Sequence, residues 1–140
     1  MADESIDLVL NKIKIDENRS EQIIILKEKS GSRYLPVVIG ISEVNAIKFK
    51  LSGIEPPRPL THDLLLQIIE TFGGKLKKVL IDRLENSTFY AKLIVSRDSE
   101  GGKEIRIDAR PSDGIAVALR ANAPIAASAS VLDEAGISDI

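Results

Sequence analysis

Short segments between turn-forming residues are the feature that most limits how this chain can fold. Clusters of Asp, Asn, Ser and Gly interrupt the 140-residue sequence at residues 16–20, 29–32 and 98–102. Between the clusters, apolar residues alternate with polar ones or form short runs, as they do in β-strands. The pattern predicts strands at residues 6–15, 22–27, 34–39, 76–82, 88–95 and 104–110, and a short strand from Pro124.

Several of these strands carry features that place them in a sheet. In residues 6–15, the apolar side chains change from even positions to odd positions between Leu10 and Ile13, which predicts a β-bulge there. Residues 34–39 contain Pro36, which cannot donate to a strand ladder, so this strand should lie at an edge or be kinked. The apolar run at residues 22–27 predicts a more central strand with both faces covered.

Three longer segments repeat apolar residues at helical spacing. Ser42 is the candidate N-cap of a first helix that ends before Gly53, and Thr61 is the candidate N-cap of a second. A third helix begins at Pro111 and runs to about Ala121, and a final helical turn covers residues 131–135. The second helix has an expected apolar stripe of Leu64, Leu65, Ile68, Ile69 and Phe72.

Together the elements predict an α+β fold. We expect a single compact domain over residues 1–140, with its core at about residues 5–136. The sheet should be mixed but largely antiparallel, with about six to seven strands, and residues 76–82 and 88–95 should form an antiparallel hairpin. Three main helices should accompany this sheet.

Composition excludes several classes of protein. The chain has no cysteine, so disulfide frameworks and thiolate chemistry are absent. No apolar run approaches the ~20 residues that span a bilayer, and the N-terminus is acidic rather than basic, so we expect a cytoplasmic protein without a membrane partner. The formal net charge of −2 means that any contact with nucleic acid must come from a local cationic cluster.

Two motifs and one isolated acid carry the candidate functional residues. In the first motif, Arg58 precedes His62, the only histidine in the chain, and Asp63, at an expected helix start where anions bind. A simpler interpretation is that His62 is a surface or cap residue and that Asp63 complements the helix dipole. Glu43, early in the first helix, is either a further ligand or an ordinary first-turn acid.

The second motif joins a strand end to a helix start. Asp108 and Asp113 offer carboxylates for a divalent metal, and the planar guanidinium of Arg110 between them suits a phosphate. The alternative is structural, with Ser112 or Asp113 capping the helix and Arg110 pairing with Asp108 or another acid. These residues alone do not decide between the two interpretations.

The sequence resembles the bifunctional nuclease domain family along nearly its whole length, from about Ile6 to about Ala135. The resemblance rests on residues 35–40 with Glu43, and on residues 57–64, 88–93 and 107–120. The chain differs from the usual family pattern at Val44 and Gly114, where alanine is common.

This resemblance implies a nuclease acting on DNA, RNA or both. It makes His62, Asp63, Asp108 and Asp113 the candidate catalytic residues. Arg58 and Arg110 become candidate phosphate-binding residues, whereas Glu43, Asp108 and Asp113 are candidate ligands of Mg²⁺ or Mn²⁺.

A function from another class remains open. The same motifs could build a non-catalytic oligomeric module that binds a nucleotide or another acidic ligand, which the acidic net charge and the scarcity of aromatic residues favour. Under either function we expect a homo-oligomer such as a dimer, because a proline-marked edge strand is often covered by self-association.

Overall fold

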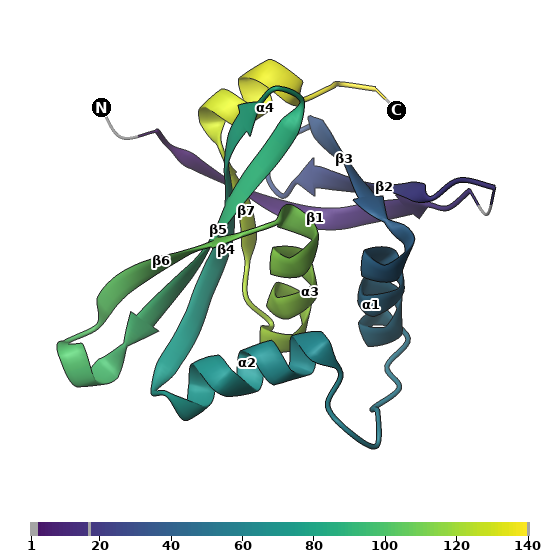
Figure 1. Cartoon of the computed structure of the whole chain (residues 1–140). Helices are drawn as coiled ribbons and strands as arrows, with labels where there is room; N and C mark the ends of the chain where they lie inside the picture. Colours follow the sequence, from purple (N-terminus) through teal and green to yellow (C-terminus); the bar gives the residue numbers. More distant parts are fainter. Residues whose placement is uncertain (1–2, 17, 140) are drawn as a thin grey trace.

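The computed structural model describes residues 3–16 and 18–139 and confirms the α+β class (Figure 1). Seven strands form one sheet in the order β3-β2-β1-β7-β4-β5-β6. The strands are β1 (Ser5–Lys14), β2 (Glu21–Glu28), β3 (Tyr34–Gly40), β4 (Gly74–Glu85), β5 (Thr88–Arg97), β6 (Lys103–Ala109) and β7 (Ile125–Ser128). The α-helices are α1 (Ile41–Leu51), α2 (Thr61–Thr71), α3 (Pro111–Ala121) and α4 (Ala129–Ala135), and one 3₁₀ turn, η1, covers Asp98–Glu100.

The short strand β7 holds the two halves of the sheet together. It pairs antiparallel with β1 and parallel with β4, and the other named strand pairs are antiparallel. All four residues of β7 are buried. A strand at the centre of a sheet has neighbours on both sides. Although β7 comes late in the sequence, it is therefore part of the core.

The bulge expected in the first strand is present. The β1–β2 register shifts between Leu10 and Lys12, and both Leu10 and Ile13 pack against the main core. An extra residue between them returns the apolar side chains to the same face of the sheet. Residues before and after the bulge can therefore contribute to one core.

The expectations for β2 and β3 hold to different extents. The strand with Pro36, β3, is an edge strand as expected. Complete coverage of β2 is wrong, because Ile23 is 37% exposed and lies opposite Val38, which is 56% exposed. Residues directly opposite in neighbouring strands share a face, so this part of the sheet is open to solvent.

The connection between β4 and β5 is tighter than the sequence indicated. Only Asn86 and Ser87 separate the two strands, and their φ angles are 52° and 63°. Two consecutive residues with positive φ are the geometry of a two-residue hairpin turn whose twist matches that of the strands.

Two helix starts differ from the predicted N-caps. The cap of α1 is Gly40 rather than Ser42, and the cap of α2 is Leu60 rather than Thr61. In α2 the reason is visible, since the Asp63 carboxylate accepts the Leu60 N–H at 2.9 Å and fixes the first turn one residue earlier.

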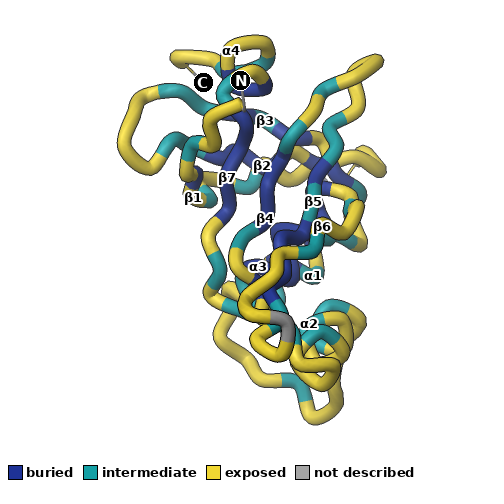
Figure 2. Tube along the Cα trace, turned by 90° about the vertical axis from the view of Figure 1, so that its left-hand side faces the viewer, coloured by how far each residue is buried: buried dark blue, intermediate teal, exposed yellow. Residues whose placement is uncertain are grey.

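Most of the apolar stripe predicted for α2 lies outside the core. None of the eleven residues of α2, all described by the structure, is buried, whereas Leu66 and Ile69 are partly buried against the main core. In Figure 2, α2 is drawn in the intermediate and exposed colours, in contrast to the buried colour of much of α3. The four stripe residues other than Ile69 face outward: Leu64, Leu65, Ile68 and Phe72.

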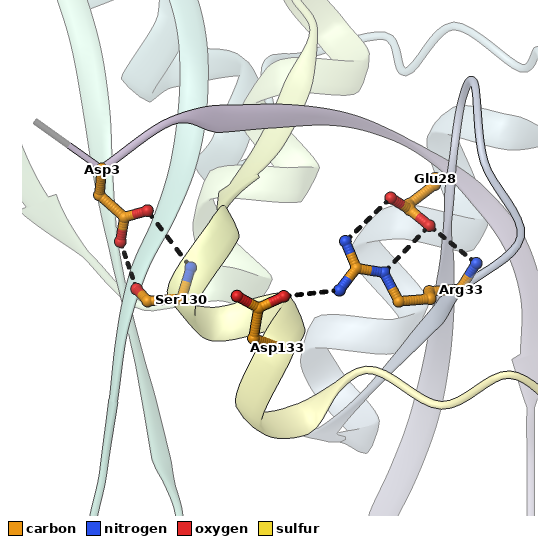
Figure 3. Close-up of polar contacts among 5 residues, drawn as sticks. All are labelled: Asp3, Glu28, Arg33, Ser130 and Asp133. Atoms are coloured by element: carbon orange, nitrogen blue, oxygen red, sulfur yellow. Dashed lines mark hydrogen bonds and ion pairs between the residues drawn. The ribbon is translucent and has the colours of Figure 1, made fainter.

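Polar contacts connect α4 with Asp3, just before β1, and with Arg33, just before β3 (Figure 3). The Arg33 guanidinium bonds to Glu28 at 3.2 Å and to Asp133 on α4 at 2.8 Å. Hydrogen bonds from Arg33 hold the pKa of Glu28 below its usual range. Asp3 accepts hydrogen bonds from the backbone and the hydroxyl of Ser130. These contacts lie far from the helix starts that carry the sequence motifs.

Candidate functional site

The first turns of three helices meet around one cavity of about 440 Å³. Glu43 is the third residue of α1, His62 the second of α2 and Asp113 the third of α3. The cavity is lined by Ser42, Glu43, Ala46, Leu60, Thr61, His62, Leu65, Arg110 and Asp113. Helix N-termini carry partial positive charge, so a cavity lined by residues from three first turns favours an anionic ligand.

A histidine–carboxylate pair lines this cavity. His62 Nε2 lies 2.9 Å from Asp113 Oδ1, and the two side chains are 12% and 30% exposed. If Nε2 carries the proton and donates a hydrogen bond to the carboxylate, Nδ1 of the neutral imidazole is free to accept a proton. His62 and Asp113, 51 residues apart in the chain, thus form the kind of imidazole–carboxylate contact that can serve a base and its orienting carboxylate.

Arg110 connects this pair with Glu43 on α1. Its Nε donates to Asp113 Oδ2 at 3.2 Å, and its Nη2 lies 3.6 Å from Glu43 Oε1. The Arg110 side chain is nevertheless 70% exposed. A guanidinium has five N–H donors, so Arg110 can keep these contacts and still offer donors to a bound anion.

Asp63 points away from the cavity although it follows His62 directly. Asp63 Oδ1 accepts a hydrogen bond from Arg120 Nε at 2.7 Å, and the Arg120 side chain is only 4% exposed. Burial opposes ionisation of Asp63, but the Leu60 N–H and Arg120 outweigh it and lower its pKa. Arg120 also donates to the carbonyl oxygens of Ala116 and Ala46, so it joins all three helices. This geometry gives Asp63 a structural role.

Asp108 lies on the opposite face of the sheet. It stands across from Lys92 on β5, whose neighbours Ala91 and Leu93 point into the main core. Asp108 Oδ1 lies 3.6 Å from Lys92 Nζ, and the Asp108 side chain is 77% exposed. The alternation of a strand therefore separates Asp108 from His62 and Asp113.

Arg58 faces a different hollow, of about 380 Å³, on the other side of the α2 start. This second hollow is also lined by Lys50, Asp63 and Arg120. The structure thus brings together Glu43, His62, Arg110 and Asp113 from the expected set, and it leaves Asp63, Asp108 and Arg58 outside this cluster. Arg120 was missed as a site-building residue, because its partner lies 57 residues away and no local pattern indicates the pair.

The arrangement does not match a metal site. Within residues 3–16 and 18–139, no three His, Asp or Glu side chains gather closely enough to hold a metal ion. The Arg110 guanidinium contacts both Glu43 and Asp113 and neutralises the oxygens that a cation would need. The same residues contain no helix with the length and apolarity of a membrane span.

Comparison with known proteins agrees with the motifs. A model of the bifunctional nuclease domain family matches residues 24–139. An uncharacterized protein of Mycobacterium tuberculosis is 44% identical over 125 residues, which cover 89% of this chain and 73% of that protein.

Plant proteins show a more distant similarity. Bifunctional nuclease 1 of Oryza sativa subsp. indica is 25% identical over 114 residues, or 81% of this chain and 34% of that protein. Bifunctional nuclease 1 of Arabidopsis thaliana is 22% identical over 103 residues, or 73% of this chain and 32% of that protein. The chain therefore spans about a third of the length of these nucleases.

Proposed function

Because the chain belongs to the bifunctional nuclease domain family, we propose that it hydrolyses phosphodiester bonds of DNA, RNA or both at the three-helix cavity. The observation that carries the proposal is the His62–Asp113 pair, held at 2.9 Å beside the exposed Arg110. A base, an orienting carboxylate and a cation are groups that can promote hydrolysis of a phosphodiester.

In this proposal His62 transfers a proton from the attacking water to the leaving oxygen. Its free ring nitrogen removes a proton from water, and the water oxygen forms a bond to phosphorus. The bond from phosphorus to the leaving sugar oxygen then breaks, and the proton held by His62 passes to that oxygen. Asp113 keeps the imidazole oriented and stabilises its charged form, as a carboxylate behind a catalytic histidine does.

Arg110 binds the phosphate as negative charge builds up in the transition state. Glu43 and Asp113 hold the guanidinium over the cavity from two sides. The three helix N-termini add partial positive charge from fixed directions. No step passes through a metal ion, since the described donor set does not fit one. The divalent-metal assistance indicated by the sequence stays a prediction that a chelator tests directly.

The test is cleavage of single-stranded DNA, duplex DNA and RNA by purified protein with Mg²⁺, with Mn²⁺ and with chelator. We expect His62→Gln and Asp113→Asn to lower the rate at least ~100-fold, the contribution of a positioned base. Asp133→Asn is the matched control, because it removes an exposed carboxylate on α4 and should retain full activity. Asp108→Asn should also retain activity, since Asp108 lies on the other face of the sheet.

Each alternative result has a definite meaning. Equal cleavage by the wild type and the His62→Gln variant would place the activity elsewhere or in a contaminant. Full activity in His62→Gln with loss in Asp108→Asn would move the site to the opposite face. If no preparation cleaves any substrate, the result would favour the binding or assembly module, with an acidic ligand bound at Arg110.

A further inference from the structure

We propose that the outward apolar stripe of α2 is the contact surface of a homodimer. The stripe consists of Leu64, Ile68 and Phe72, which follow one another at four-residue spacing, with Leu65 beside them. Their exposed fractions are 48%, 46%, 75% and 38% in the order Leu64, Ile68, Phe72 and Leu65. The proposal concerns assembly and does not depend on the nuclease activity.

The stripe is additional to the side by which α2 joins its own fold. Leu66 and Ile69 contact the main core, and Asp63 contacts Arg120 on α3. The four stripe residues project from the remaining surface of the helix. A surface helix normally has one apolar stripe, and a helix with apolar side chains on most of its circumference is normally covered on more than one side. One covering surface of α2 is therefore missing from the isolated chain.

The charge pattern favours a second copy of this chain as the covering surface. The stripe contains no charged residue, and the only polar residue in line with it is Thr61. A two-fold contact places each surface against its own copy, so an uncharged stripe pairs with itself without repulsion. A polyanion would find no cation on these residues, which argues against nucleic acid as the occupant.

The size of the stripe agrees with a dimer contact. With the adjacent Leu60, 40% exposed, the stripe presents roughly 400–500 Å² of residue surface, within the ~300–600 Å² of the largest patch on a monomer, which is often functional. A standard interface buries about 800 Å² on each partner, with an apolar centre and a polar rim. Gln67 and Thr71, both exposed on α2, are suitably placed to supply such a rim.

The position of the stripe connects assembly with the cavity. Leu60 and Leu65 lie at the N-terminal end of the stripe and also line the cavity of His62 and Arg110. A second copy on α2 therefore borders the mouth of this cavity. The contact differs from the edge-strand pairing that the sequence indicated, because it uses a helix rather than β3.

The deciding measurement is molar mass by sedimentation velocity across protein concentrations. We expect a dimer for the wild type and at least a ~100-fold weaker dimer for Ile68→Glu, since a carboxylate at an apolar contact must be desolvated without a partner. Val38→Glu is the matched control on the edge strand β3, where an exposed apolar residue is replaced in the same way. It should remain dimeric.

A second variant tests the contact even if Ile68→Glu does not fold. The chain has no cysteine, so Ile68→Cys introduces a single thiol that should form a disulfide-linked dimer on mild oxidation, whereas Val38→Cys should not. A wild type that stays monomeric at ~100 μM, about a hundred thousand times a nanomolar Kd, overturns the proposal. So does a dimer that Val38→Glu disrupts and Ile68→Glu leaves intact.

Discussion

His62 and Asp63 are neighbours in the sequence, yet their side chains serve different parts of the molecule. His62 Nε2 contacts Asp113 at the cavity, whereas Asp63 Oδ1 contacts the buried Arg120. The adjacent histidine and aspartate therefore do not act as a pair. His62 lines the cavity, and Asp63 connects α2 with α3. The two residues should respond differently to substitution.

Asp63→Asn should reduce stability without removing a group from the cavity. The change leaves the Arg120 guanidinium, 4% exposed, without its charged partner. Breaking one partner of a buried ion pair costs several kcal/mol, and because Asp63 keeps 28% exposure we expect about 2–3 kcal/mol, measured by urea unfolding. Asp133→Asn breaks a bridge whose carboxylate is 72% exposed and should cost less than about 1 kcal/mol. Equal losses in the two variants would contradict the structural role of Asp63.

The stabilisation from Asp63 should depend on pH in a definite direction. Its pKa is lowered in the folded chain, so its contribution is complete above the ordinary aspartate pKa of ~3.9 and is lost as pH falls through the lower folded value. The difference in unfolding free energy between the wild type and Asp63→Asn should be constant from pH 7 to 5 and shrink below about pH 4. Comparison with this variant removes the effect of Glu28, which titrates in both proteins. A difference that grows on acidification would show that Arg120 does not lower this pKa.

The His62–Asp113 contact should appear as non-additivity in the rates. If Asp113 acts only by orienting His62, the double variant His62→Gln/Asp113→Asn should be no slower than the slower single variant. The measurement is kcat/KM for one short oligonucleotide with the four proteins of the cycle. Multiplied losses would mean that the two groups act separately, for example with Asp113 acting mainly through Arg110, which it contacts at 3.2 Å.

Local patterns predicted the elements of the fold well, because turn residues and side-chain periodicity act within a few residues. The bulge after Leu10 and the edge position of the strand with Pro36 were both visible in the sequence. The stripe of α2 was identified correctly as apolar, but the sequence did not show that most of it is exposed. Periodicity shows which side of a helix is apolar and does not show what covers it.

The candidate site was predictable in part. The two motifs and Glu43 contain the ionisable residues that line the cavity, but only the packing of α1, α2 and α3 determines which of these residues contact one another. Asp108 shows the limit most clearly, since the alternation that predicted its strand also turns it away from the core side. Asp63 could not be assigned from the sequence because its partner, Arg120, comes from the far end of another helix.

Gly114 gives a test of how closely α3 is packed on the sheet. A Cβ added there would lie 2.6 Å from Val79 Cγ1, and Val79 is fully buried on β4. Gly114→Ala gains about 1 kcal/mol of helix propensity but forces an overpacked contact that costs about 1–3 kcal/mol, so we expect a net loss of roughly 1 kcal/mol in urea unfolding. In a Val79→Ala background the clashing methyl is gone, and the same Gly114→Ala change should stabilise the protein. The reversal of sign is the critical result, because it links the glycine to this one neighbour. Stabilisation in both backgrounds would mean that α3 can move away from β4 and accept the added methyl group without any change on the strand.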